Sequence, residues 1–202
     1  MNIKKRFTTQ RDYLRMLHTD PELLDKMSEK IMTWLPPFPR EYVVVFIGTD
    51  RSTGDALGPL AGTLFNKMKP KHITVYGTLH NPVHAKNLTY YINKIDRHHH
   101  HPFIIAIDAC LGKADSIGKL IAGTGSIRPG AALNKSLPSI GDIHITGVVN
   151  MSGFMEYSIL QSTRLSTVMD MSNSIAQLLD VIDQQLTYNH SLPALAIPQK
   201  PI

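Results

Sequence analysis

The sequence predicts an α/β domain with a mostly parallel central sheet and flanking helices. Two short runs, 42–48 (YVVVFIG) and 103–109 (FIIAIDA), are rich in apolar and β-branched residues, as is typical of strands buried on both faces of a parallel sheet. A helical pattern at 57–68 and a strand-like run at 72–76 lie between them, which indicates a βαβ unit. Of the 202 residues, 43% are hydrophobic and 18% charged, so the chain can bury one core and is too apolar to be disordered.

Local signals predict each element in chain order. Asp20, Pro21 and Glu22 form a helix start, and apolar residues then recur at helical spacing as far as Leu35, before two prolines. This helix is amphipathic, so we expect it to cover the core or a second subunit. After Cys110, frequent glycines predict hairpins or a partly antiparallel edge. The expected order is a helix at 20–35, a strand at 42–48, a helix at 57–68, a strand at 72–76, a helix at 81–95, a strand at 103–109, short runs such as 118–122, a strand at 143–149, and helices at 152–161 and 167–186.

Composition and charge limit the compartment and the partners. We divide the chain into a flexible arm at 1–19, one α/β domain at 20–188 and a loose tail at 189–202. No apolar run approaches the roughly 18 to 20 residues that cross a bilayer, and the first residues lack a secretory signal, so we expect a cytoplasmic protein without a membrane partner. The single cysteine, Cys110, agrees with a reducing compartment. The net charge of +5 is spread along the chain without interleaved aromatics, so nucleic-acid binding is not expected.

Two aspartates fall where a parallel sheet gathers its functional groups, beyond the carboxyl ends of its strands. Asp55 lies in the loop after the first buried strand, and Asp108 directly follows the apolar run FIIAI. A carboxylate there costs several kcal/mol of desolvation unless it is paired, hydrogen-bonded or bound to a cation. Asp108 is therefore either a site residue or an acceptor that fixes its own loop. A divalent cation would need further oxygen ligands, such as Asp50 or Asp142.

The loop GTDRSTGDALGP has the features of an anion or substrate site. Its glycines permit close backbone approach, and the loop leads into a helix start. It is neither a Walker A loop nor a GxGxxG fingerprint, so no nucleotide or other cofactor is expected. His98–His101 is predicted to be an exposed loop, and Cys110 a buried small side chain. The substrate-binding candidates are Gly48, Thr49, Asp50, Gly54, Gly58, His144 and Asn150.

Two segments together resemble the spore germination protease family. They are FIGTDRSTGDALGPLAG and IIAIDACLG, and the whole chain is similar to small sporulation proteins related to that protease. The wider superfamily includes the hydrogenase maturation endopeptidases. The resemblance implies a three-layer, phosphorylase/hydrolase-like α/β fold, catalytic roles for Asp55 and Asp108, and a spore protein or peptide as substrate in the developing spore. In the maturation endopeptidases a His completes a nickel-sensing triad, whereas the corresponding stretch here offers Asn150, with His144 six positions earlier, so we expect no metal.

The expected function is endopeptidase activity by a pair of aspartates. Two carboxyl groups beside one crevice can share a proton, so that one acts as general base toward water and the other as general acid toward the leaving amine. The residues alone do not assign the two roles. The alternative is a catalytically inactive relative that binds a peptide or regulates sporulation, because fold does not establish function. A homo-oligomer is compatible with either reading.

Overall fold

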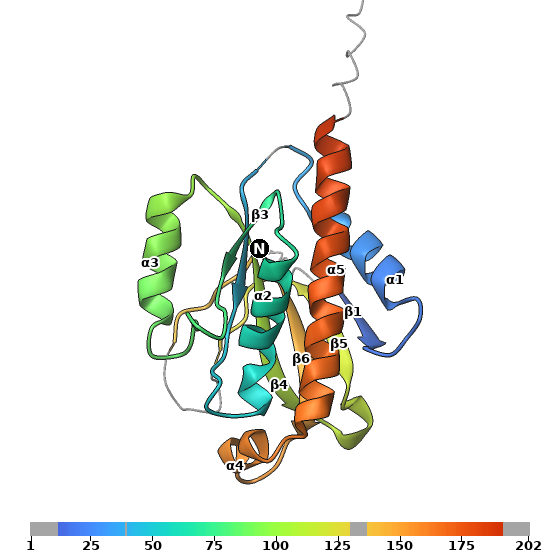
Figure 1. Cartoon of the computed structure of the whole chain (residues 1–202), viewed down its shortest axis with the longest axis vertical. Coiled ribbons are helices and arrows are strands. Elements are labelled where there is room, and N and C mark those ends of the chain that lie inside the picture. The colour runs from blue at the N-terminus through green and yellow to red at the C-terminus, as the bar shows by residue number, and fades with distance from the viewer. Residues whose placement is uncertain (1–11, 39, 130–136, 192–202) are drawn as a thin grey trace, which may run out of the picture.

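The computed structural model describes residues 12–38, 40–129 and 137–191, which form a six-stranded sheet with helices on both faces (Figure 1). The strands lie in the order β1-β5-β6-β4-β2-β3. They are β1 (Tyr13–Leu17), β2 (Tyr42–Phe46), β3 (Ile73–Tyr76), β4 (Phe103–Gly112), β5 (Lys119–Thr124) and β6 (Ile143–Met151). The helices are α1 (Leu23–Met32), α2 (Leu57–Lys67), α3 (Leu88–His98), α4 (Glu156–Gln161) and α5 (Leu165–Ser191).

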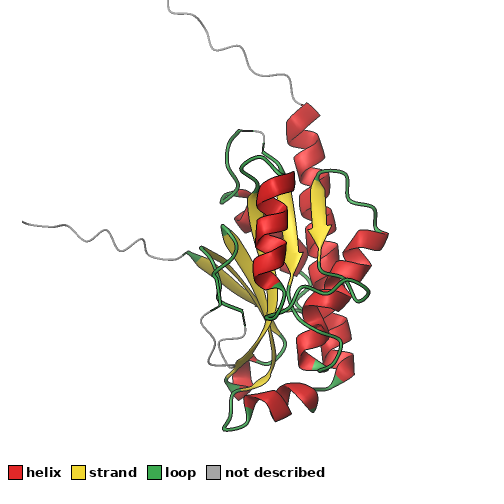
Figure 2. Cartoon of the chain, turned by 90° about the vertical axis from the view of Figure 1, so that its left-hand side faces the viewer, coloured by secondary structure: helices red, strands yellow, loops and turns green. Residues whose placement is uncertain are grey.

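The sheet separates two apolar layers, which confirms the predicted three-layer α/β fold. On one face, Val44 and Phe46 of β2 pack in a core that includes buried residues of α1, α2 and α5. On the other face, Val43 and Val45 pack against buried residues of α3, such as Leu88. All five residues of β2 are buried, as its unbroken apolar run predicts. Figure 2 shows most of the helices on one side of the sheet.

The sheet has a parallel half and an antiparallel edge. β3, β2, β4 and β6 run parallel to one another. β5 is antiparallel to β6, and β1 is antiparallel to β5. The antiparallel edge predicted from the glycines after Cys110 is therefore confirmed. β2 ends beside Ile107 of β4, so Asp108, the next residue of β4, and the loop that carries Asp55 lie at one edge of the sheet.

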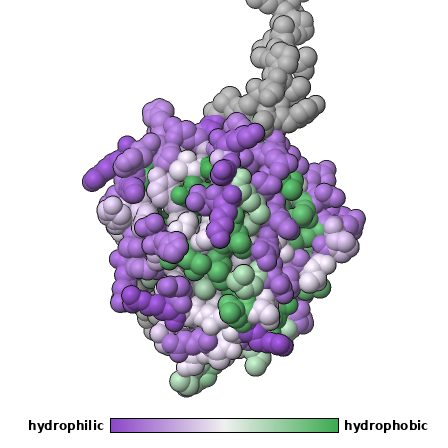
Figure 3. All heavy atoms as spheres, in the orientation of Figure 1, coloured by the Kyte–Doolittle hydropathy of each residue, from purple (hydrophilic) through white to green (hydrophobic). Residues whose placement is uncertain are grey.

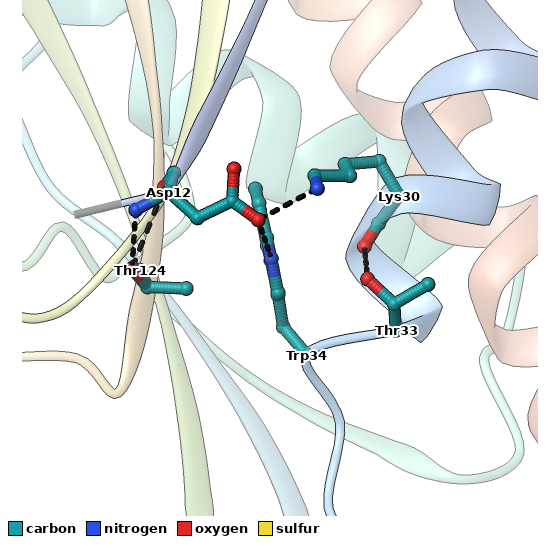
Figure 4. A network of polar contacts seen from close by, with 5 residues as sticks. All are labelled: Asp12, Lys30, Thr33, Trp34 and Thr124. Atoms are coloured by element: carbon teal, nitrogen blue, oxygen red, sulfur yellow. Dashed lines mark hydrogen bonds and ion pairs between the residues drawn. The ribbon is translucent and has the colours of Figure 1, made fainter. Parts of the chain in front are cut away.

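The prediction of a flexible arm at 1–19 was wrong for residues 13–17, because they form β1. The signal was the alternation in YLRML, because Leu14 and Met16 are partly buried against the core while Tyr13 and Leu17 are exposed. Residue 12 is tied to α1: Asp12 Oδ2 accepts hydrogen bonds from Lys30 Nζ at 2.6 Å and Trp34 Nε1 at 3.0 Å (Figure 4). Residues 1–11 and 192–202 lie outside the described residues, and α5 continues through the first three residues of the predicted tail.

Several element boundaries differ from those predicted. α3 begins at Leu88 rather than at residue 81, because Val83 forms a bridge to Ile47 and the Asn87 side chain ties residues 82–87 into a turn. α4 begins at Glu156 rather than at residue 152. β4 continues three residues beyond the predicted end, alongside β6.

None of the helices in the described part of the chain is both long and apolar enough to span a membrane.

Candidate active site

One pocket of about 640 Å³ lies at the carboxyl ends of β4 and β2 and contains both predicted aspartates. Its wall comes from four parts of the chain: the turn before α2, the end of β4, the segments around β5 and β6, and α4. The lining residues are Asp55, Asp108, Ala109, Cys110, Leu111, Ser126, Ile127, Arg128, Ser139, His144, Thr146, Glu156 and Leu160.

Asp108 is held in the pocket by the ladder between β4 and β6. It pairs with Thr146 in register, and both residues line the pocket. Its Oδ1 accepts a hydrogen bond from the Ala109 N–H at 2.9 Å. Burial raises the pKa of Asp108 to about 8, the Ala109 hydrogen bond opposes the rise, and the charge of Asp55 adds to it. Asp108 is therefore protonated near neutral pH.

Asp55 approaches the same pocket from a single 3-10 turn, Gly54–Ala56, that precedes α2. The turn is fixed to the end of β2 because the Thr49 N–H donates to the Asp55 carbonyl oxygen at 3.1 Å. Burial raises the pKa of Asp55, and the nearby Ser52 hydroxyl partly offsets this. Asp55 is the partner that ionises first, because the pKa of Asp108 carries the larger shift.

The two carboxyl groups therefore form an acid and a base in one pocket. Near neutral pH, a protonated Asp108 can donate a proton and an ionised Asp55 can accept one. Their charges interact, so the two groups titrate as a pair. An arrangement of this kind can activate a water molecule on one side and protonate a leaving group on the other.

His144 is the third predicted residue that the structure brings to this pocket. Its Nδ1 lies 2.8 Å from the Gly125 carbonyl oxygen. A carbonyl oxygen only accepts, so Nδ1 carries the proton and Nε2 of the neutral ring is an acceptor. The ring stands over Gly123 of β5, where an added Cβ would meet Cε1 and Nε2 at 3.0 Å. His144 can therefore accept a hydrogen bond from a bound substrate.

The glycines of the 48–58 loop do not line the pocket but allow close packing. A Cβ at Gly48 would lie 1.9 Å from the Asp55 carbonyl oxygen, and φ there is 144°. A Cβ at Gly58 would lie 2.1 Å from the carbonyl oxygen of Ile47. These two glycines let the start of α2 pack on the end of β2, which positions Asp55.

Four further predicted substrate-binding residues also lie outside the pocket wall. They are Thr49, Asp50, Gly54 and Asn150. Asn150 joins β6 to α4: its Nδ2 donates to the Ile159 carbonyl oxygen and to Thr163 Oγ1, both at 3.2 Å, and its Oδ1 accepts from the Met151 N–H at 2.9 Å. A substrate-binding role for any of the four stays a prediction.

The sequence pattern missed several residues of the pocket wall. Thr146 could have been found, because it lies two positions after His144 on the same face of a predicted strand. Glu156 and Leu160 lie one turn apart on α4, but nothing in their pattern points to the sheet edge. Ser126 and Arg128 come from the segment after β5, which has no periodicity.

Neither a metal nor a nucleophilic thiol fits the pocket as described. The described residues include no group of three or more His, Cys, Asp or Glu side chains placed to hold a metal ion. Asn150 is engaged at both ends of its amide. Burial raises the pKa of Cys110, which keeps it a thiol near neutral pH. The acid-base groups that line the pocket are therefore the carboxyl pair, His144 and Glu156.

Comparison with known proteins gives a family, a relative and a fold. Residues 15–178 match the model of a family described as "Protein of unknown function (DUF1256)". The "Uncharacterized protein YyaC" of Bacillus subtilis (strain 168) is 54% identical over 142 residues, which are 70% of this chain and 69% of that protein. A crystal structure of the NiFe hydrogenase maturation protease HycI from Thermococcus kodakarensis KOD1 is similar with a TM-score of 0.51 and 17% identity, and the match covers 72% of this chain and 94% of that one. This likeness shows a maturation-protease fold.

Proposed function

The chain belongs to the family described as "Protein of unknown function (DUF1256)", and we propose that it is a peptidase that hydrolyses a peptide bond with Asp55 and Asp108. The observation that carries the proposal is the carboxyl pair in one pocket, with the pKa of Asp108 raised to about 8 and that of Asp55 raised by less. Buried carboxyl groups with strongly shifted pKa values are more frequent at catalytic sites than elsewhere. The maturation-protease fold agrees with a peptidase.

The proposed reaction needs one water molecule and no covalent enzyme intermediate. The ionised Asp55 takes a proton from the water molecule while the oxygen of this water forms a bond to the peptide carbonyl carbon. Asp108, protonated, gives its proton to the leaving nitrogen as the C–N bond breaks. The products are a carboxylic acid and an amine, and transfer of the proton from Asp55 to Asp108 restores the starting state.

The substrate part of the proposal rests on the resemblance to the germination protease. That resemblance favours a spore protein cleaved in the cytoplasm of the developing spore. His144 supports a protein or peptide substrate, because its Nε2 can accept a backbone or side-chain hydrogen bond at the pocket wall.

An inactive peptide-binding relative is the second candidate, and one observation favours it. In the maturation endopeptidases that the chain resembles a His completes a nickel-sensing triad, whereas the corresponding stretch here offers Asn150, whose amide is committed to α4 and to the adjacent backbone. A protein of this kind would retain the pocket and bind a peptide without cleaving it.

Cleavage of spore proteins distinguishes the two candidates. The purified full-length protein is incubated with an extract of spore proteins, and new peptide N-termini are identified by mass spectrometry. We expect new termini with the wild type and none with Asp108→Asn, which is nearly isosteric. Specific retention of a spore protein by both forms, without new termini, would favour the inactive relative.

A further inference from the structure

β4 continues past the end of its neighbour β2 beside the carboxyl pair. The pairing of β2 with β4 ends at Phe46 opposite Ile107, with one further hydrogen bond from the Ile47 N–H to the Ile107 carbonyl oxygen at 2.8 Å. The chain has left β4 by Thr49, because the Thr49 N–H donates to the Asp55 carbonyl oxygen at 3.1 Å and not to β4. The last residues of β4, through Gly112, pair with β6. Among the described residues, the side of β4 that β2 has left is therefore an open edge without a strand partner.

The alternation of hydrogen bonds along β4 identifies the main-chain groups on this open edge. Ile107 bonds toward β2, whereas the Gly112 carbonyl oxygen accepts from Ser152 N–H, beyond β6, at 2.7 Å. The pairing with β6 shifts register between Cys110 and Leu111, but the bond of Gly112 toward β6 shows that the alternation continues. Successive residues of a strand bond to opposite neighbours, so Ala109 and Leu111 face the same side as Ile107. The Ala109 N–H is taken by Asp108 Oδ1. Among the described residues, the Ala109 carbonyl and the N–H and carbonyl of Leu111 face the side where β4 has no strand partner.

This edge forms part of the pocket, and exposed apolar side chains follow at the end of the neighbouring strand β6. Ala109 and Leu111 line the pocket together with both aspartates. The end of β6 and the segment that follows it carry an apolar patch whose side chains are more than half exposed: Met151, Phe154, Met155 and Tyr157. Met151 pairs with Gly112 at the end of the ladder. In Figure 3, moderately hydrophobic residues project at the lower end of the molecule, where Figure 1 places α4.

We propose that an extended, apolar segment of the substrate protein adds to the open edge of β4 at Ala109–Leu111 as a further strand. This inference rests on the proposed peptidase function. Main-chain bonds to Leu111 and to the Ala109 carbonyl would hold the segment. Its side chains would alternate between the pocket face and the opposite face, and the apolar patch would contact those that lie near α4. A strand in this position runs directly past Asp108, so a peptide bond of the segment reaches the carboxyl pair. The substrate class is therefore an unfolded tail or loop and not a folded surface.

Binding of a defined peptide tests the inference without any need for cleavage. The probe is a fluorescein-labelled peptide of twelve residues with apolar residues at every second position, and binding to the full-length protein is measured by fluorescence anisotropy. Leu111→Ala keeps the N–H, and Leu111→Pro removes it while leaving the bonds to β6 in place. We expect the Ala variant to bind within about threefold of wild type and the Pro variant at least about fivefold more weakly than the Ala variant, as the loss of one hydrogen bond implies.

Amide exchange in the wild type decides the question even if Leu111→Pro does not fold. We expect exchange of the Leu111 N–H to slow when the peptide is added. The inference is overturned if the peptide does not bind, if it binds without slowing this exchange, or if the exchange slows with protein concentration alone, since a second copy of the chain would then occupy the edge. Cleavage of a protein without protection of Leu111 would overturn the inference and keep the peptidase. Protection without cleavage of spore proteins would support the inference and overturn the peptidase.

Discussion

Asp55 and Asp108 are electrostatically coupled: burial is the main cause that raises the pKa of Asp108 to about 8, and the charge of Asp55 raises it further. The two residues reach the pocket from different elements, a 3-10 turn and the end of a central strand. Because two neighbouring carboxyl groups do not readily ionise together, the pair retains one proton near neutral pH. This proton gives the pocket its proposed acid and leaves Asp55 as its base.

Replacement of Asp108 by Asn should leave the stability unchanged or raise it. The folded protein keeps a proton on Asp108 up to about pH 8, whereas the unfolded chain releases it near the model value of 3.8. The free energy of unfolding of the wild type therefore falls as the pH rises between these values. Asp108→Asn removes this pH-dependent loss of stability, so the variant's Tm should exceed that of the wild type by more and more toward pH 8. Each kcal/mol of difference in the free energy of unfolding should shift Tm by about 2–4 °C. Thermal melts at pH 5 and pH 8 measure the difference.

A structural aspartate provides the matched control for this prediction. Asp183 is 4% exposed, and its two carboxylate oxygens accept the backbone N–H groups of Lys71 and His72 at 2.8 and 2.9 Å. Asp183→Asn should lower the free energy of unfolding by about 1–3 kcal/mol, because it weakens charge-assisted hydrogen bonds. A comparable fall in Tm for Asp108→Asn would show that Asp108 is structural and would favour the inactive relative.

The rate of peptide cleavage should have a bell-shaped pH profile, with a maximum between an acid limb and a basic limb. Activity should decline above about pH 8, as Asp108 loses its proton, and on the acid side as Asp55 gains one at a pKa above its model value of 3.8. Ser52→Ala removes the nearby hydroxyl that lowers the pKa of Asp55, so its acid limb should move to higher pH. Initial rates between pH 4 and 10 check both limbs. Activity that still increases above pH 9 would contradict a protonated Asp108 as the acid.

His144 should contribute to substrate binding through Nε2 and not through Nδ1. In His144→Asn the amide can still donate to the Gly125 carbonyl oxygen, but the acceptor at the Nε2 position is lost. In His144→Gln the amide can provide an acceptor at the Nε2 position, but the donor to the Gly125 carbonyl oxygen is lost. We expect the Asn variant to raise KM by about three- to tenfold with kcat little changed, and the Gln variant to affect KM less. Equal losses of kcat and kcat/KM in the Asn variant would assign His144 to the reaction step instead.

Gly48 and Gly58 should prove essential to folding and not to substrate contact. A methyl group at either position would lie within 2.1 Å of a backbone oxygen, which must then move. Gly58→Ala should therefore destabilise the protein by about 1–3 kcal/mol or more. Gly153→Ala is the control, because an added Cβ there meets the flexible Ile159 side chain at 2.8 Å. Urea unfolding measures the two changes, and equal effects would refute the packing role.

The sequence predicted the main fold and the carboxyl pair for one physical reason. Runs such as YVVVF are typical of buried strands, and the ends of parallel strands meet at one edge, so Asp55 and Asp108 were expected to converge. The glycines were harder to interpret, because a loop glycine that permits packing has the same sequence signal as one that approaches a ligand. β1 was missed because five alternating residues are a weak pattern.

The rest of the pocket depends on tertiary contacts that no local pattern encodes. Arg128 and Ser139 reach the pocket from segments without periodicity, and their position follows from the bridge between the neighbouring residues Ile127 and Ile140. The length of β4 is set by its pairing with β6, because CLG at 110–112 contains no strong stop signal for either a strand or a turn.

Titration of the Asp108 carboxyl carbon by 13C NMR tests the shared proton most directly, and it needs no substrate. In the wild type the Asp108 signal should titrate near pH 8, because burial and the charge of Asp55 both oppose ionisation. In Asp55→Asn the charge is gone while the size of the side chain is kept, so the Asp108 midpoint should move to lower pH. A wild-type midpoint near 4 that does not respond to Asp55→Asn would contradict the account.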